Sequence, residues 1–122
     1  MRTIIKEGWD TIQGICYEDS HGAGWWDGVS PEDFGVVPTK LCLIHSEISE
    51  AMEGHRKGLM DDKLTHRPAV EVELADAIIR IADLAGALNL DVGGAIEEKL
   101  LFNRTRNDHK KEVREGEGGK KY

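Results

Sequence analysis

Apolar residues recur at helical spacing in four segments of this chain, and this periodicity constrains the fold more than any other feature. Steps of three and four residues place side chains on one face of an α-helix. The four stripes are, in chain order, Ile5, Trp9, Ile12 and Cys16; Leu41, Ile44, Ile48 and Met52; Val70, Leu74, Ile78, Ile81, Ala85 and Leu88; and Val92, Ile96 and Leu100. No segment shows a convincing two-residue alternation, the pattern of a half-buried strand. The sequence therefore predicts an all-α fold, a four-helix bundle.

Residues with known preferences for helix ends place the boundaries of three of these helices. Gly58 follows the second stripe where a glycine can end a helix, so the second helix is expected over about residues 38–55. Pro68 opens the third helix, because proline is favoured in a first helical turn. Asp91 precedes the fourth stripe as a candidate N-cap. The short turn over residues 88–91 predicts that the third and fourth helices pack as antiparallel neighbours.

The connection between the first two helices, residues 19–37, is long for a compact domain. Connections of this length tend to be functional or disordered, and the adjacent Trp25 and Trp26 argue against disorder. Their indole rings could stack on a nucleotide base, since they offer a π-face to any base. The alternatives are that the rings bury the loop against the helices, or that one ring packs there while the other stacks. Trp25 and Trp26 are therefore candidate substrate-binding residues.

Length and composition narrow the class of protein. The 122 residues fit one domain over residues 1–108, followed by a tail rich in Lys, Glu and Gly over residues 109–122. The net charge of −7 argues against a nucleic-acid groove, which needs a surplus of cations. No apolar run approaches the ~20 residues that span a bilayer. Two cysteines are a poor disulfide framework, so Cys16 and Cys42 are expected to be reduced thiols of a soluble, cytoplasmic protein.

Two pairs of acidic residues carry the strongest chemical signal. Glu47 and Glu50 lie three residues apart in EISE, and Glu73 and Asp76 lie three apart in ELAD. On a helix each pair stands side by side on one face, at the border of the apolar stripe. If the two stripes pack together, the four carboxylates meet, and they would repel one another unless a cation were present. Oxygen ligands without His or Cys suit Mg²⁺ or Mn²⁺, which can activate a water and bind phosphate oxygens.

The alternative for these acids is a pair of solvated helix faces. A further candidate group lies on the fourth helix, where Lys99, Asn103 and Arg106 follow at helical spacing. Two cations and an amide on one face suit phosphate oxygens and a sugar hydroxyl, although basic residues are also common at the end of a helix. Arg80 and Asp83 are expected to form ion pairs at the surface or between subunits.

The order EISE, then ELAD, then a helix reading EEKLLFNRTRNDHK resembles the MazG-like branch of the all-α nucleoside triphosphate pyrophosphohydrolases. The pattern of that family is ExxE, a gap, ExxD, and then a Lys and an Asn on the following helix. The segment LIHSEISEAMEGHRKG strengthens the resemblance, which extends over about residues 20 to 110. The resemblance implies a helical bundle that forms a homodimer or homotetramer. It also implies hydrolysis of a nucleoside or deoxynucleoside triphosphate to the monophosphate and pyrophosphate.

The resemblance also assigns roles by position. Glu47, Glu50, Glu73 and Asp76 would be the ligands of Mg²⁺, with Mn²⁺ as a substitute. Glu47 or Glu50 would also help to deprotonate the attacking water. Lys99, Asn103 and Arg106 would contact phosphates or sugar.

Two other hypotheses compete with a pyrophosphohydrolase. A di-iron carboxylate bundle needs Glu-x-x-His on two helices, which this chain lacks. A non-catalytic helical dimer that binds a protein partner would explain the stripes but leaves the paired acids as a coincidence.

Overall fold

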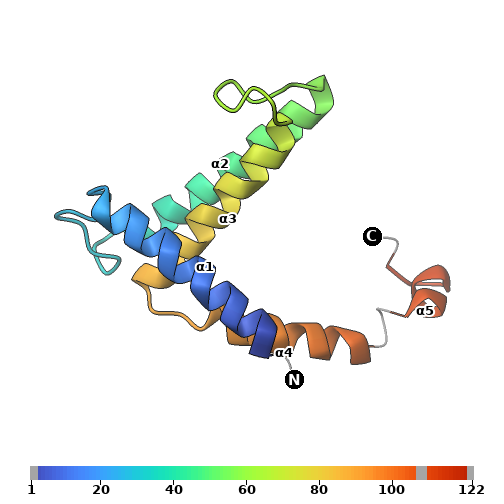
Figure 1. Ribbon diagram of the computed structural model, residues 1–122. Helices are drawn as coiled ribbons and strands as arrows, with labels where there is room; N and C mark the ends of the chain where they lie inside the picture. The colour runs from blue at the N-terminus through green and yellow to red at the C-terminus, as the bar shows by residue number, and fades with distance from the viewer. Residues whose placement is uncertain (1–2, 107–109, 121–122) are drawn as a thin grey trace. The chain divides into compact units, whose positions relative to one another are not determined.

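The computed structural model describes residues 3–106 and 110–120, and the regular structure in these ranges is helical (Figure 1). The helices are α1 (Thr3–Gly22), α2 (Val36–Lys57), α3 (Ala69–Ala87), α4 (Val92–Thr105) and α5 (Lys111–Glu115). No strand occurs within the described ranges, although an isolated antiparallel bridge joins Met60 and Pro68. The all-α prediction is confirmed. No helix in this part of the chain is both long enough and apolar enough to cross a membrane.

The residues that were expected to end helices do so. Gly58 closes α2 in the left-handed conformation with φ 62°, and its N–H donates to the carbonyl of His55. Pro68 is the N-cap of α3. The carboxylate of Asp91 accepts a hydrogen bond from the backbone N–H of Gly94, which caps α4. Each of these residues acts through its own backbone preference or a local hydrogen bond, so its effect needs no tertiary contact.

The connection between α1 and α2 is shorter than expected. Because α1 continues to Gly22, the connection spans residues 23–35, and the prediction that it starts at residue 19 is wrong. The polar residues at the end of α1 remain helical, and Ser20 uses its hydroxyl to donate to Asp83 of α3. The connection ends at Gly35, whose φ of 79° is strained for residues with a side chain.

The chain divides into two compact units, and each is described by itself. The hairpin unit, residues 11–90, contains the C-terminal part of α1 together with α2 and α3. The terminal unit combines residues 1–10 with residues 91–122 and contains α4 and α5. Since α3 and α4 belong to different units, their antiparallel packing stays a prediction.

Helices α2 and α3 lie side by side in the hairpin unit (Figure 1). Small residues make the contact: Ala51 and Gly54 on α2 and Ala69 and Ala77 on α3 are buried. A Cβ atom added to Gly54 would lie 2.8 Å from the Cβ of Ala69, so glycine is needed at this approach. The small side chains let the two backbones come close together.

Six large residues of the two apolar stripes remain exposed and are not buried in this contact. They are 37 to 61% exposed, and they are Leu41, Ile48, Met52, Leu74, Ile78 and Ile81. The condition stated from the sequence, that the two apolar stripes pack together, is therefore not met by these six residues. The physical reason is that each helix has two faces that could be buried, one with large apolar residues and one with small residues. The face with small residues allows the two helix backbones to approach more closely. The stripes are left as an unpartnered apolar surface on the described part of the hairpin unit.

The terminal unit joins the start of α1 to α4. The backbone N–H of Lys6 donates to Oε1 of Glu97 at 3.1 Å, and its ammonium lies 2.9 Å from Asp91. Gly93 is buried where α4 passes close to the backbone of Lys6. The charged tail contains the short helix α5. The predicted boundary between residues 108 and 109 lies outside the described residues.

Candidate metal centre and adjoining cavity

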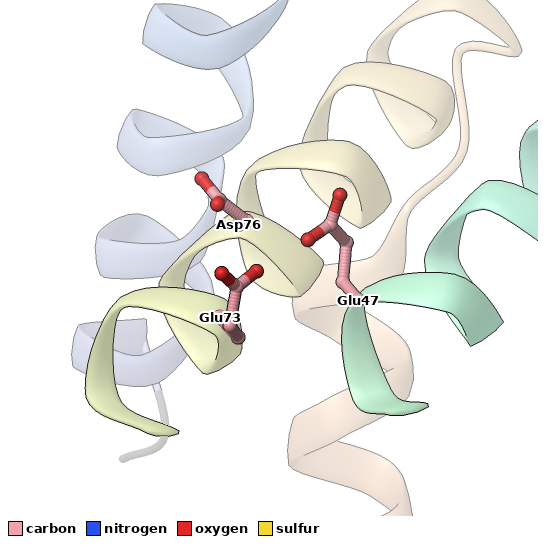
Figure 2. Close-up of side chains that lie close together, drawn as sticks. All are labelled: Glu47, Glu73 and Asp76. Carbon is pink, nitrogen blue, oxygen red and sulfur yellow. The ribbon is translucent and has the colours of Figure 1, made fainter. Parts of the chain in front are cut away.

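Three carboxylates converge between α2 and α3. Figure 2 shows Glu47 extending from α2 toward Glu73 and Asp76 on α3. One oxygen from each lies within 4.8 Å of the others. Glu47 is only 8% exposed, and Glu73 and Asp76 are half-buried. The spacing of three residues brings Glu73 and Asp76 to the same face of α3, and the close approach of the helices brings Glu47 to them.

Glu50, the fourth predicted acid, lies next to this cluster. Glu50 lies one turn after Glu47 on α2, and its side chain interacts with those of Glu47 and Glu73. Unlike the other three acids, Glu50 is exposed, and it contributes no oxygen to the group that converges within 4.8 Å. The structure therefore brings all four predicted acids to one place, with three at its centre.

The three central acids shift one another's pKa values. A hydrogen bond with Glu47, together with burial and the neighbouring Glu50, raises the pKa of Glu73 to about 8. Burial would also raise the pKa of Glu47, but hydrogen bonds with Glu73 and Arg80 outweigh burial and hold this pKa below its ordinary value. Burial and the charge on Glu47 raise the pKa of Asp76. Carboxyl groups this close ionise in separate steps, because the first charge opposes the second.

The donor set fits a hard divalent cation. Oε2 of Glu73 is buried and accepts no hydrogen bond from a donor within the described structure. Its neighbours Glu47 and Glu50 are themselves acceptors, so a shared proton or a cation must satisfy this oxygen. The centre offers carboxylate oxygens without His or Cys, which suits Mg²⁺ or Mn²⁺.

Arg80 is the cation closest to the centre that the structure describes. Its Nε donates to Oε1 of Glu47 at 3.0 Å. The side chain of Glu47 is 11% exposed and that of Arg80 is 40% exposed. The expectation that Arg80 forms an ion pair at the surface or between subunits is corrected, since its partner is a buried residue of its own chain.

A cavity of about 560 Å³ adjoins the centre. It lies between the end of α1, the following loop, and the facing sides of α2 and α3. Glu47 and Asp76 form one part of its wall, so two of the three central acids face it. The other lining residues are Cys16, Asp19, Ser20, Ala23, Trp25, Lys40, Leu43, Ile79, Arg80 and Asp83. The cavity thus combines charged groups with apolar and aromatic wall, the usual composition of a small-molecule site.

The two adjacent tryptophans have different environments. Trp25 is 70% exposed and lines the cavity. Trp26 is 6% exposed, its Nε1 donates to Asp83 at 2.9 Å, and the ammonium of Lys40 lies 4.7 Å from its ring centroid. Of the two indoles predicted to bind substrate, the structure places Trp25 at the cavity, whereas Trp26 anchors the loop to α3.

Asp83 is expected to stabilise the hairpin unit. Its two carboxylate oxygens accept hydrogen bonds from Ser20 and from Trp26, each at 2.9 Å, and so join α1 and the loop to α3. Asp83→Ala leaves the buried N–H of Trp26 without its acceptor and should lower the free energy of unfolding by about 2 kcal/mol. Urea unfolding measures this change. Asp62→Ala, at an exposed loop position, is the matched control, and an equal effect of both variants would contradict the assignment.

The predicted phosphate-binding residues of α4 belong to the terminal unit. Lys99 is exposed, with its ammonium 4.9 Å from the ring centroid of Phe102. Arg106 follows the last residue of α4 with an extended backbone, so its expected place on the helix is wrong. Its Nη1 nevertheless donates to Oδ1 of Asn103 at 3.3 Å. The four acids lie in the hairpin unit, and a substrate contact of these α4 residues stays a prediction.

Sequence reasoning missed Arg80 and Asp83 as residues of the cavity, although a signal was present. With Glu73 and Asp76 they follow steps of three, four and three residues, so all four share a face of α3. Four charged residues on one face of a helix whose only other charged residue is Glu71 indicate a polar lining. Lys40 and Asp19 carry no comparable signal, because only the fold brings α1 and α2 to this cavity.

Comparisons of this chain with models of protein families, with curated proteins and with solved structures find no match.

Proposed function

We propose that this protein is a Mg²⁺-dependent nucleoside triphosphate pyrophosphohydrolase, which cleaves the bond between the α- and β-phosphates and releases pyrophosphate. The observation that carries the proposal is the convergence of Glu47, Glu73 and Asp76 within 4.8 Å at the wall of a cavity. The buried, unsatisfied oxygen of Glu73 adds support, because it lacks the partner that a cation would supply. The resemblance of the acid motifs to the MazG-like family names the reaction.

Each of the four acids has a distinct part in this proposal. Glu47, Glu73 and Asp76 would hold the ion, with Glu50 beside them as a further ligand. When bound, the ion supplies charge to the phosphate oxygens and lowers the pKa of a water. Glu47 or Glu50 is the candidate general base, and the low pKa of Glu47 keeps it ready to accept a hydrogen bond. The rigid helices keep these side chains in place, which limits reorganisation during the reaction.

The rest of the cavity would hold the nucleoside. Trp25 presents an exposed indole for stacking on a base. Ser20, Lys40 and Asp19 provide polar groups at the same cavity. A volume of about 560 Å³ lies within the range of about 300 to 1,000 Å³ that is common for small-molecule sites.

We propose in addition that the chain forms a homodimer or homotetramer through the exposed stripes of α2 and α3. Each of the six large apolar residues named above is at least 37% exposed, and they recur at helical spacing on α2 and α3. Large exposed apolar patches on proteins commonly mark interaction surfaces. A second copy would cover it and complete a helix bundle. Light scattering checks this proposal: a particle of the monomer mass, 13.6 kDa, would contradict it.

The same exposed stripes favour a second candidate function, a non-catalytic helical module that binds another protein. In that case the three acids are a solvated cluster and bind no ion. The two functions differ in their response to nucleotides, because only the enzyme is stabilised by Mg²⁺ together with a triphosphate.

A panel of the eight common ribo- and deoxyribonucleoside triphosphates tests the enzyme. We expect pyrophosphate release from at least one of them with Mg²⁺, and none with a chelator. Release of inorganic phosphate instead of pyrophosphate would contradict the proposed bond cleavage. If no triphosphate is hydrolysed and none raises the melting temperature in the presence of Mg²⁺, the interaction module is the better account.

A further inference from the structure

We propose that Arg80 has two successive partners, Glu47 when no ion is bound at the centre and a phosphate oxygen of the substrate once a divalent ion occupies the centre. The inference rests on the proposed function and adds a residue that belongs to neither acid motif. Arg80 would thus be a substrate-binding residue that becomes available only when the metal is present.

The first partner is seen directly. Nε of Arg80 donates to Oε1 of Glu47 at 3.0 Å. A carboxylate as buried as Glu47 requires a counter-charge, because an isolated buried charge is strongly disfavoured. Arg80 supplies that charge through this contact. Its contact uses one edge of the guanidinium, which carries five N–H donors in total, so donors remain for a second acceptor.

The second partner follows from what a cation would do to the first. Glu47 is one of the three acids that converge on the candidate metal position. An ion that takes the carboxylate of Glu47 supplies the counter-charge itself and repels the guanidinium beside it. Arg80 then no longer has to neutralise Glu47.

The position of Arg80 favours phosphate as its new partner. Arg80 lies one helical turn after Asp76 on α3, and both residues line the cavity. A triphosphate held at the centre would therefore place its oxygens within the same cavity wall. Planar guanidinium groups bind phosphate oxygens with two parallel hydrogen bonds. Lys40 is the other cation described at this cavity, and its ammonium lies over the ring of Trp26.

Two binding measurements on Arg80→Gln test this inference without relying on turnover. Calorimetry with Mg²⁺ alone measures metal affinity, which tests the contact between Arg80 and Glu47. Calorimetry with an α,β-methylene nucleoside triphosphate in saturating Mg²⁺ measures the affinity for the analogue, which tests the contact between Arg80 and phosphate. We expect Arg80→Gln to bind Mg²⁺ several-fold more tightly than the wild type, because a competing cation is removed. We expect it to bind the analogue about tenfold more weakly, because a charge-assisted contact is lost.

Two further variants make the result specific. Arg80→Lys keeps the charge but not the planar fork, so it should bind Mg²⁺ like the wild type and the analogue with intermediate affinity. Arg56→Gln removes the same charge from an exposed position of α2 that pairs with Glu53, and it should behave like the wild type in both measurements. Circular dichroism establishes that each variant is folded.

The outcomes separate this inference from the proposed function. If the wild type binds Mg²⁺ and the analogue, and Arg80→Gln binds both with unchanged affinity, the inference is overturned and the proposed function stands. Tighter Mg²⁺ binding with unchanged affinity for the analogue would also overturn it, because Arg80 would then serve Glu47 alone. Failure of the wild type to bind either probe would overturn the proposed function and the inference together.

Discussion

Asp76→Asn is expected to reduce pyrophosphate release by about 10³-fold or more, which corresponds to about 4 kcal/mol of transition-state stabilisation. The substitution keeps the size of the side chain but removes the charge of one of three converging carboxylates. An amide is a weak ligand for a hard divalent ion, so metal affinity and the activation of water should both suffer. Initial-rate assays with saturating Mg²⁺ measure the loss.

The fold of Asp76→Asn should be unaffected. Asp76 is half-buried beside Glu47, and the charge on Glu47 raises its pKa, so a neutral residue relieves repulsion in metal-free buffer. A melting temperature equal to or above that of the wild type is expected in a chelator. Glu71→Gln, at an exposed position of the same helix, is the matched control and should keep full activity. Normal turnover in Asp76→Asn would remove the basis of the metal centre.

Mg²⁺ binding is expected to weaken by about tenfold for each pH unit below about pH 8. The reason is the proton on Glu73, whose pKa the hydrogen bond with Glu47 and burial raise to about 8. A cation that uses the Glu73 carboxylate must displace this proton, so protons and Mg²⁺ compete. Calorimetry at about pH 8 and about pH 6 should give dissociation constants that differ by about 50-fold, because Glu73 is already half protonated at about pH 8. Equal affinities at the two pH values would contradict the role of Glu73 as a ligand.

The same proton makes metal-free stability depend on pH. The pKa of Glu73 is raised from an ordinary 4.5 to about 8, so between these values the folded state binds a proton that the unfolded state has released. The contribution to stability is fully present below the ordinary pKa and is lost as pH rises through about 8. The melting temperature in a chelator should therefore fall over this range. Glu73→Gln should lack this part of the pH dependence, and an unchanged slope in that variant would contradict the assignment.

The candidate centre could be predicted from sequence because its chemistry is repeated on two helices. The spacing of three residues alone places each pair of acids on one helix face, Glu47 with Glu50 and Glu73 with Asp76. Arg80 and Asp83 could have been added by extending the same spacing along α3. The partners of Arg80 and Asp83 could not be predicted in this way. They are Glu47, Ser20 and Trp26, which contact α3 from other elements. A contact between elements depends on packing, which no local pattern encodes.

Trp25 and Trp26 show the same limit at single residues. The sequence predicts an ordered loop and allows one indole to pack while the other stacks, but it does not say which of the two packs. The structure buries Trp26, with its N–H on Asp83, and leaves Trp25 exposed at the cavity. Adjacent residues of a loop commonly point in different directions, so the choice between them is made by where the loop meets α3.

The sequence by itself determined the all-α class and the three helix boundaries at Gly58, Pro68 and Asp91, because periodicity and these residues act through short-range geometry. Tertiary structure decided which helix faces meet. The large apolar stripes were the natural candidates for the contact between α2 and α3, yet the faces with Ala51, Gly54 and Ala77 pack there. Hydrophobicity indicates that a helix face is buried, but it does not indicate which other face it packs against. The close approach of two backbones favours the smallest side chains. That approach brings Glu47 to the acids of α3 and leaves the apolar stripes exposed.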